Sequence, residues 1–128
     1  MKLGYTIIYV ADVPATLAFY GEAFGLKTRF IHESEQYGEL ETGSTTLAFA
    51  SEALAESNGV TFTQNKQGKP AAGFEIALVT EAVDVAYAHA CASGASSIKK
   101  PQEKSWGQKV AYVRDLNGVI VEICSPVG

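Results

Sequence analysis

Long apolar runs, basic clusters and paired cysteines are all missing from this 128-residue chain. No apolar run approaches the roughly 20 residues that a membrane-spanning helix needs. The formal net charge is −4, and the ten lysine and arginine residues are scattered singly apart from Lys99 and Lys100, so no nucleic-acid partner is expected. The two cysteines, Cys91 and Cys124, lie far apart, which supports neither a zinc ribbon nor a disulfide scaffold. We expect both to be buried as small apolar residues.

Motifs for nucleotide cofactors and for serine hydrolases are also missing. The sequence contains no Gly-x-Ser-x-Gly elbow, no Gly-x-Gly-x-x-Gly, no Walker loop and no His-Glu-x-x-His. The N-terminus follows a strand pattern from residue 3 and shows no signal-peptide core. With 47% hydrophobic and 19% charged residues, the composition predicts one globular domain, which we expect to be cytoplasmic and not membrane-bound.

An internal repeat dominates the sequence, and its first copy reads as strand, helix and three strands. Residues 3–10 form a β-branched and aromatic run. A helix is expected to begin after Asp12 and to end at Gly25, because its apolar residues recur at helical spacing. Three short strand candidates follow, at residues 27–32, 36–41 and 45–50.

The second copy repeats this order 70 residues later, with Val83 and Tyr87 standing where Val13 and Leu17 stand in the first copy. A strand is predicted at residues 73–79, then a helix at 81–93 that Gly94 ends, then strands at 95–99, 108–114 and 119–124. The buried stripe of this helix is predicted to be Val83, Ala86, Tyr87 and Ala90. Between the copies, the polar segment 53–72 is interpreted as a linker, in which residues 60–62 could add a short strand.

Two such repeats predict an α+β fold with two βαβββ modules, residues 1–52 and 73–128, within a single domain of residues 1–128. Each module is a small sheet with a helix on one face, so its other face needs a cover. Pairing the two sheets face to face gives a cup-shaped mixed β-sheet with the helices outside. A cup between sheets is a site for a small molecule.

At this point the pattern resembles the vicinal oxygen chelate superfamily, which includes glyoxalase I, fosfomycin-resistance proteins, extradiol dioxygenases and bleomycin-resistance proteins. The resemblance rests on LGYTIIYVADVPATLAFYGEAFGLK, on GFEIALVTEAVDVAYAHACASGA and above all on WGQKVAYVRDLNGVIVEICSP. It implies a divalent metal in the cup of the enzymes, held by His, Glu, His and Glu from the first and fourth strand of each module.

The positions that the resemblance assigns to those ligands hold Tyr5, Ala48, Glu75 and Glu122 here. Two carboxylates without an imidazole are a poor transition-metal site, so no metal or other cofactor is expected, and Glu75 and Glu122 would be the ligands if one bound. This departure resembles the metal-free bleomycin-resistance proteins, which sequester a drug in the cup of a dimer.

Glu75 and Glu122 are the strongest candidates for a functional site, because both interrupt runs suited to buried strands. The alternative is that they are strand-edge charges facing solvent. If they face the cup, they would attract a cationic ligand.

The remaining candidates for ligand contact are aromatic positions on or beside the cup strands. Each is individually more typical of a core, except Trp106, which precedes a strand in a loop where a large aromatic side chain is costly unless it covers something. These positions are Tyr5, Phe49, Trp106 and Tyr112. His32 and His89 are interpreted as solvated surface residues.

Three functions remain open. The first is a homodimeric, metal-free protein of the antibiotic-resistance type that binds a small aromatic or cationic molecule. The second is a glyoxalase-like lyase or isomerase with a divalent metal at an incomplete site, Glu122 as ligand or base and Glu75 as its partner. The third is a structural dimer or protein-interaction module whose cup has closed.

Overall fold

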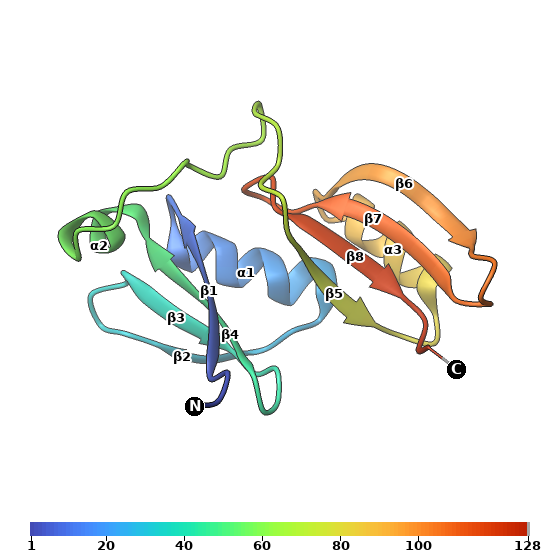
Figure 1. Cartoon of the computed structure of the whole chain (residues 1–128), viewed down its shortest axis with the longest axis horizontal. Coiled ribbons are helices and arrows are strands. Elements are labelled where there is room, and N and C mark those ends of the chain that lie inside the picture. The colour runs from blue at the N-terminus through green and yellow to red at the C-terminus, as the bar shows by residue number, and fades with distance from the viewer. Residues whose placement is uncertain (128) are drawn as a thin grey trace. The chain divides into compact units, whose positions relative to one another are not determined.

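The computed structural model describes residues 1–127, which fall into two compact units, one from Met1 to Asn65 and one from Lys66 onward (Figure 1). Each unit contains a four-stranded mixed sheet with a helix packed on one face. The prediction of an α+β fold with two βαβββ repeats is confirmed. No helix within residues 1–127 is long and apolar enough to cross a membrane.

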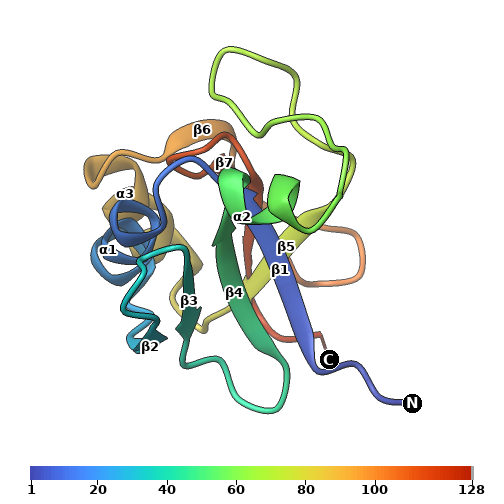
Figure 2. The ribbon, with the colours of Figure 1, turned by 90° about the vertical axis from the view of Figure 1, so that its left-hand side faces the viewer.

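The sheet of the first unit has the order β1-β4-β3-β2, in which β1 runs parallel to β4 and the other neighbours are antiparallel. Figure 2 shows α1 along one side of β3 and β4, and α2 follows the end of β4. The elements are β1 (Tyr5–Val10), α1 (Val13–Phe24), β2 (Thr28–Ile31), β3 (Tyr37–Leu40), β4 (Thr46–Ser51) and α2 (Glu52–Ser57).

Helix α1 begins and ends where its capping residues predict. The Asp12 side chain accepts a hydrogen bond from the backbone N–H of Ala15 at 3.0 Å, and Gly25 ends the helix in the left-handed conformation with φ 69°. The helix then packs closely on the sheet through Leu17. A Cβ added to Gly38 of β3 would lie only 2.6 Å from the Leu17 side chain, so glycine lets α1 approach this strand.

The second unit repeats the arrangement with the order β5-β8-β7-β6, and β5 runs parallel to β8. Helix α3 packs on β6, β7 and β8. The elements are β5 (Glu75–Val79), α3 (Val83–Ala92), β6 (Ser96–Glu103), β7 (Lys109–Arg114) and β8 (Ile120–Cys124).

An arginine anchors the start of this unit to the turn between β7 and β8. The Arg114 guanidinium donates to the carbonyl oxygens of Gly118, Lys66 and Lys69 at 2.8, 3.2 and 2.7 Å. The buried Asp115 carboxylate accepts from the backbone N–H groups of Asn117 and Val119 and so shapes the turn. The segment from Lys66 to Lys69, at the start of the second unit, is therefore held to β7 by hydrogen bonds from Arg114 to its backbone carbonyl groups.

The structure differs from the predicted elements in three places. Helix α2 occupies the beginning of the segment interpreted as a linker, because the Ser51 side chain caps it by accepting from the N–H of Leu54 at 3.0 Å. Within the described residues 58–74 there is no strand, so residues 60–62 add none. Strand β6 extends to Glu103, beyond the predicted end at residue 99, with irregular pairing between Ser97 and Gln102 that hides its alternation.

Burial also departs from prediction in α3. Val83 and Ala90 are buried, whereas Ala86 and Tyr87 are half-buried because the helix has only one short stripe against the sheet. Cys124 is buried as predicted, but Cys91 is only half-buried.

Candidate functional site

Strand alternation separates the helix-covered and helix-free faces of the second sheet. Ser97 contacts Tyr87 of α3, with 2.6 Å between their hydroxyl oxygens, so Ser97 and its strand partner Val113 face the helix. Because neighbouring residues of a strand point to opposite faces, Tyr112 of β7 and its partner Glu122 of β8 lie on the helix-free face. This face carries the polar groups discussed below.

Glu75 and Glu122 meet on the helix-free face of the second unit. In the parallel pairing of β5 and β8, Glu75 stands opposite Ile120 and Ala77 opposite Glu122, which places both carboxyl groups on one face within hydrogen-bonding reach. Desolvation raises the pKa of Glu75 above its ordinary value, and the hydrogen bond to Glu122 and its charge raise it further. The Glu75 carboxyl group therefore retains its proton to higher pH than a solvated carboxyl group would.

Two further groups respond to this acidic pair. Desolvation and the Glu122 charge raise the pKa of Tyr112. Burial, followed by contact with Glu122, raises the pKa of Cys124 to about 11, so its thiol is neutral at physiological pH and is not a nucleophile. The cluster combines two carboxyl groups with two neutral donors and contains no imidazole.

A hollow of about 310 Å³ lies beside the acidic pair. Its only charged residue is Glu75, and its aromatic residues are Tyr112 and Phe74, whose side chain is 41% exposed. It is lined by Gly73, Phe74, Glu75, Ile98, Tyr112 and Ile120. An apolar hollow with one acidic group at its wall suits a ring that carries a positive charge or a hydrogen-bond donor.

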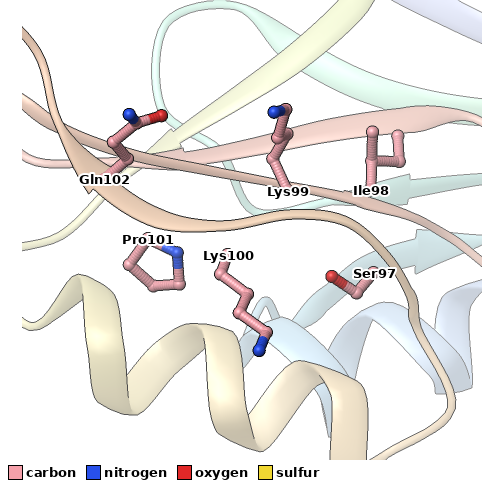
Figure 3. Close-up of a pocket in the computed structure, with 6 residues that line it drawn as sticks. All are labelled: Ser97, Ile98, Lys99, Lys100, Pro101 and Gln102. Atoms are coloured by element: carbon pink, nitrogen blue, oxygen red, sulfur yellow. The ribbon is translucent and has the colours of Figure 1, made fainter.

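A larger hollow, of about 460 Å³, borders β6 but gathers no convergent groups (Figure 3). All of its lining residues come from one stretch of this strand, Ser97 to Gln102. In Figure 3 the side chains of Ser97 and Lys100 point toward α3, whereas those of Lys99 and Gln102 point away from it. Groups on opposite sides of one strand cannot hold a common ligand.

Trp106 lies apart from the 310 Å³ hollow. Its side chain is 64% exposed, and its indole N–H donates to the Gln108 side chain at 2.8 Å. The Gln108 amide in turn donates to the backbone carbonyl of Ser125. Trp106 is thus held near the Cys124 end of β8, and its role as a ligand wall stays a prediction.

In the first unit, Tyr5 and Ala48 share the helix-free face and Phe49 does not. The Phe49 ring is fully buried, with its centroid 5.0 Å from that of Tyr20 in α1. Ala48, its neighbour in β4, therefore points the other way, as do Ile7, its partner in β1, and Tyr5. Phe49 is a core residue on the helix-covered face, so Phe49 and Ala48 point to opposite sides of β4.

Three residues that the sequence analysis did not identify, Phe74, Tyr37 and Glu39, lie near the predicted site residues. Phe74 lines the hollow, but it falls just before β5, where no strand alternation marks it. Tyr37 and Glu39 lie on the helix-free face of β3, since Gly38 between them faces α1. In the sequence, the only sign of this pair is that Tyr37 and Glu39 alternate with Gly38 in a predicted strand. His32 and His89 are exposed, as expected.

The sequence matches one protein-family model over nearly its whole length. The model described as Glyoxalase/Bleomycin resistance protein/Dioxygenase superfamily matches residues 2–123. The chain belongs to this superfamily. The comparison with curated protein sequences gave no match.

Solved structures share the fold across almost the whole chain. A glyoxalase-related enzyme from Fulvimarina pelagi is 22% identical, with a TM-score of 0.83 over 98% of this chain and 88% of its own. A glyoxalase/bleomycin resistance protein/dioxygenase family enzyme from Burkholderia phytofirmans PsJN is 25% identical, with a TM-score of 0.78 and 98% of both chains covered. TioX from Micromonospora sp. ML1 is 19% identical, with a TM-score of 0.72 and 98% of both chains covered.

The residues at the superfamily's metal positions do not fit a resident transition metal. Ala48 offers no donor atom, and Tyr5 offers a phenol in place of an imidazole. Glu75 and Glu122 offer two carboxylate oxygens and no nitrogen ligand, and the raised pKa of Glu75 opposes the deprotonated form that a metal needs. Within residues 1–127, no three His, Cys, Asp or Glu side chains gather to hold a metal ion.

Proposed function

We propose that this superfamily member binds a small, partly aromatic cation, without a metal, on the helix-free face of its second unit. The observation that carries the proposal is the contact between Glu75 and Glu122 beside an apolar hollow of about 310 Å³. Two like charges brought together oppose each other, so the pair does not itself stabilise the fold. Glu75 is exposed and Glu122 is half-buried, so both are accessible to a ligand. A cation would relieve that repulsion, while the hollow receives its ring.

Binding of a cation is expected to release a proton. A cation bound beside Glu75 would lower the raised pKa of this carboxyl group, so proton release is expected at pH values near that pKa. Tyr112 stays a neutral phenol and is free to donate to the carboxylate or to contact the ring. These groups would hold a ligand and exclude water from it, and they require no covalent step.

We also propose a cytoplasmic homodimer with a role in resistance to a cytotoxic aromatic compound. Each unit has a sheet face that no helix of that unit covers, and a symmetric pair of chains is the common way to cover such faces. Light scattering at micromolar concentration should give twice the chain mass of 13.6 kDa. A monomer would contradict the dimer and leave the binding proposal standing.

The binding test measures affinity by calorimetry, with the emission of the single tryptophan as a second signal. Bleomycin and 9-aminoacridine, a simple planar cation, are titrated into the protein at 150 mM NaCl while Trp106 emission is recorded and calorimetry gives the affinity. At this ionic strength screening acts over about 8 Å, so the net charge of −4 contributes little steering. Glu122→Gln should weaken binding of the responsive compound about tenfold, the loss expected for one charge-assisted contact.

Glu81→Gln is the matched control, since it removes one exposed charge from the same unit outside the cluster. Equal affinities of Glu122→Gln and Glu81→Gln, or no saturable binding of either compound, would refute the proposal. About one zinc, nickel or iron ion per chain in protein purified without chelator, lost in Glu122→Ala, would favour the glyoxalase-like lyase instead.

A further inference from the structure

The helix-free face of the first unit carries a polar pair of its own. The Tyr37 hydroxyl donates to Oε2 of Glu39 at 2.8 Å, and both residues project from β3 on the side opposite α1. Glu39 stands directly opposite Ala48 in the pairing of β3 with β4. Because alanine ends at Cβ, the neighbouring strand places no long side chain beside the carboxylate.

The Glu39 carboxylate retains acceptor capacity. A carboxylate accepts about four hydrogen bonds, and this one receives a short bond from Tyr37 at Oε2. At Oε1 its neighbour is the Nε atom of Arg29, 3.8 Å away, which is beyond hydrogen-bonding distance. The Glu39 side chain is 14% exposed and that of Arg29 49%, so the carboxylate is sheltered while the guanidinium lies largely in water.

Apolar and aromatic surfaces border this carboxylate. The Phe30 ring lies 6.5 Å from the Tyr37 ring, centroid to centroid, and remains 46% exposed. Tyr5, on the same face, is 56% exposed, and the pKa of Tyr37 is raised by burial and by Glu39. Large aromatic side chains left this open, beside a sheltered acceptor, offer flat contact area to a ring.

We propose that Tyr37 and Glu39, flanked by Phe30 and Tyr5, form a binding site in the first unit for a neutral, flat heteroaromatic ring whose N–H donates to Oε1 of Glu39. Arg29 makes the local charge close to neutral, so this site favours a neutral donor, whereas the Glu75–Glu122 pair favours a cation. The inference goes beyond the proposed function, because it requires none of the residues of the second unit.

The test compares two probes that differ only in the N–H donor. Benzimidazole and 1-methylbenzimidazole, both neutral at pH 7.5, are titrated separately into ¹⁵N-labelled full-length protein and followed by amide chemical shifts. Benzimidazole should give saturable shifts centred on Tyr5, Phe30 and residues 37–39. The methylated probe should bind about fivefold more weakly, as expected for the loss of one hydrogen bond.

Three variants identify the acceptor. Glu39→Gln keeps the shape of the side chain but replaces a charged acceptor by a weaker one, and should bind benzimidazole about threefold more weakly. Tyr37→Phe keeps the ring, loses the bond that orients Glu39, and should reduce the discrimination between the probes. Glu56→Gln, at an exposed position of α2, is the charge-matched control and should bind as the parent does.

The site is refuted if benzimidazole gives no saturable shifts at these amides up to 20 mM, if both probes bind equally, or if Glu39→Gln behaves like Glu56→Gln. None of these outcomes depends on Trp106 emission or on Glu122→Gln, which test the second unit. A failure here is therefore distinguishable from a failure of the proposed cation site.

Discussion

Replacing Gly118 by alanine should destabilise the second unit much more than the same replacement at Gly43 in the first. Both glycines have left-handed backbone angles, with φ 85° at Gly118 and 88° at Gly43. A Cβ at Gly43 would meet nothing within 4 Å. A Cβ at Gly118 would lie 2.5 Å from Nη2 of Arg114 and 2.8 Å from the carbonyl oxygen of Lys66. The comparison therefore separates backbone strain from the loss of the arginine anchor.

The two costs follow from these contacts. An alanine in the left-handed region costs about 1–2 kcal/mol, and its stiffer unfolded chain returns about 0.4–1 kcal/mol, so Gly43→Ala should cost at most about 1.5 kcal/mol. Gly118→Ala carries the same backbone cost and also displaces Arg114, which donates to four backbone carbonyl groups. Losing charge-assisted bonds at a half-exposed site adds about 2 kcal/mol. The total of about 3 kcal/mol should lower the Tm by about 10 °C for a chain of this length.

Urea unfolding followed by both circular dichroism and Trp106 emission measures this difference, because Trp106 lies in the second unit. A cycle with Arg114→Ala supplies the internal control: in that background Gly118→Ala should cost less, since the clash with Nη2 is gone and only Lys66 remains. If Gly118→Ala costs no more than Gly43→Ala, or if the two substitutions near Arg114 are additive, the anchoring argument is wrong.

Three further predictions concern the acidic pair, a helix cap and the thiols. The folded-state pKa of Glu75 is raised, so the folded protein binds more protons than the unfolded chain above the ordinary value of 4.5, and stability falls as pH rises through the raised pKa. Glu75→Gln should remove this fall, so that the free energy of unfolding rises by less than about 1 kcal/mol at pH 8, after solvent screening, and does not change at pH 4. Thermal melts that show equal gains in stability at both pH values would contradict this prediction. Asp12→Ala removes the α1 cap and should cost about 1 kcal/mol by urea unfolding, whereas an unchanged midpoint would mean that the cap is not needed. At pH 8, iodoacetamide should label Cys91 well before Cys124, whose buried thiol has a pKa of about 11; equal labelling by mass spectrometry would refute that environment.

The repeat made most of the fold predictable, because it supplied the same elements twice in the same order. Helix α1 was predictable to its caps, since Asp12 and Gly25 are local signals that need no tertiary context. Helix α2 was not, because six residues following a strand carry too little periodicity to show an amphipathic pattern. The extension of β6 was hidden for another reason: its irregular pairing breaks the two-residue alternation on which strand prediction depends.

The sequence predicted site residues only at strand positions that the 70-residue repeat relates to one another. Glu75 lies 70 residues after Tyr5, and the structure shows that Glu75 contacts Glu122, a charge placed opposite Ala77 by the β5–β8 register. Ala48, at the position that the resemblance assigns to a metal ligand in the first repeat, lies on the helix-free face. Its neighbour across the strands could not be predicted, because Glu39 is nine residues earlier in the chain and pairs with Ala48 only through the β3–β4 register. A side chain removed from one strand leaves room that the adjacent strand can use. Alanine at residue 48 therefore leaves room beside the Glu39 carboxylate, and the two probes with Glu39→Gln measure whether that carboxylate binds a ring N–H.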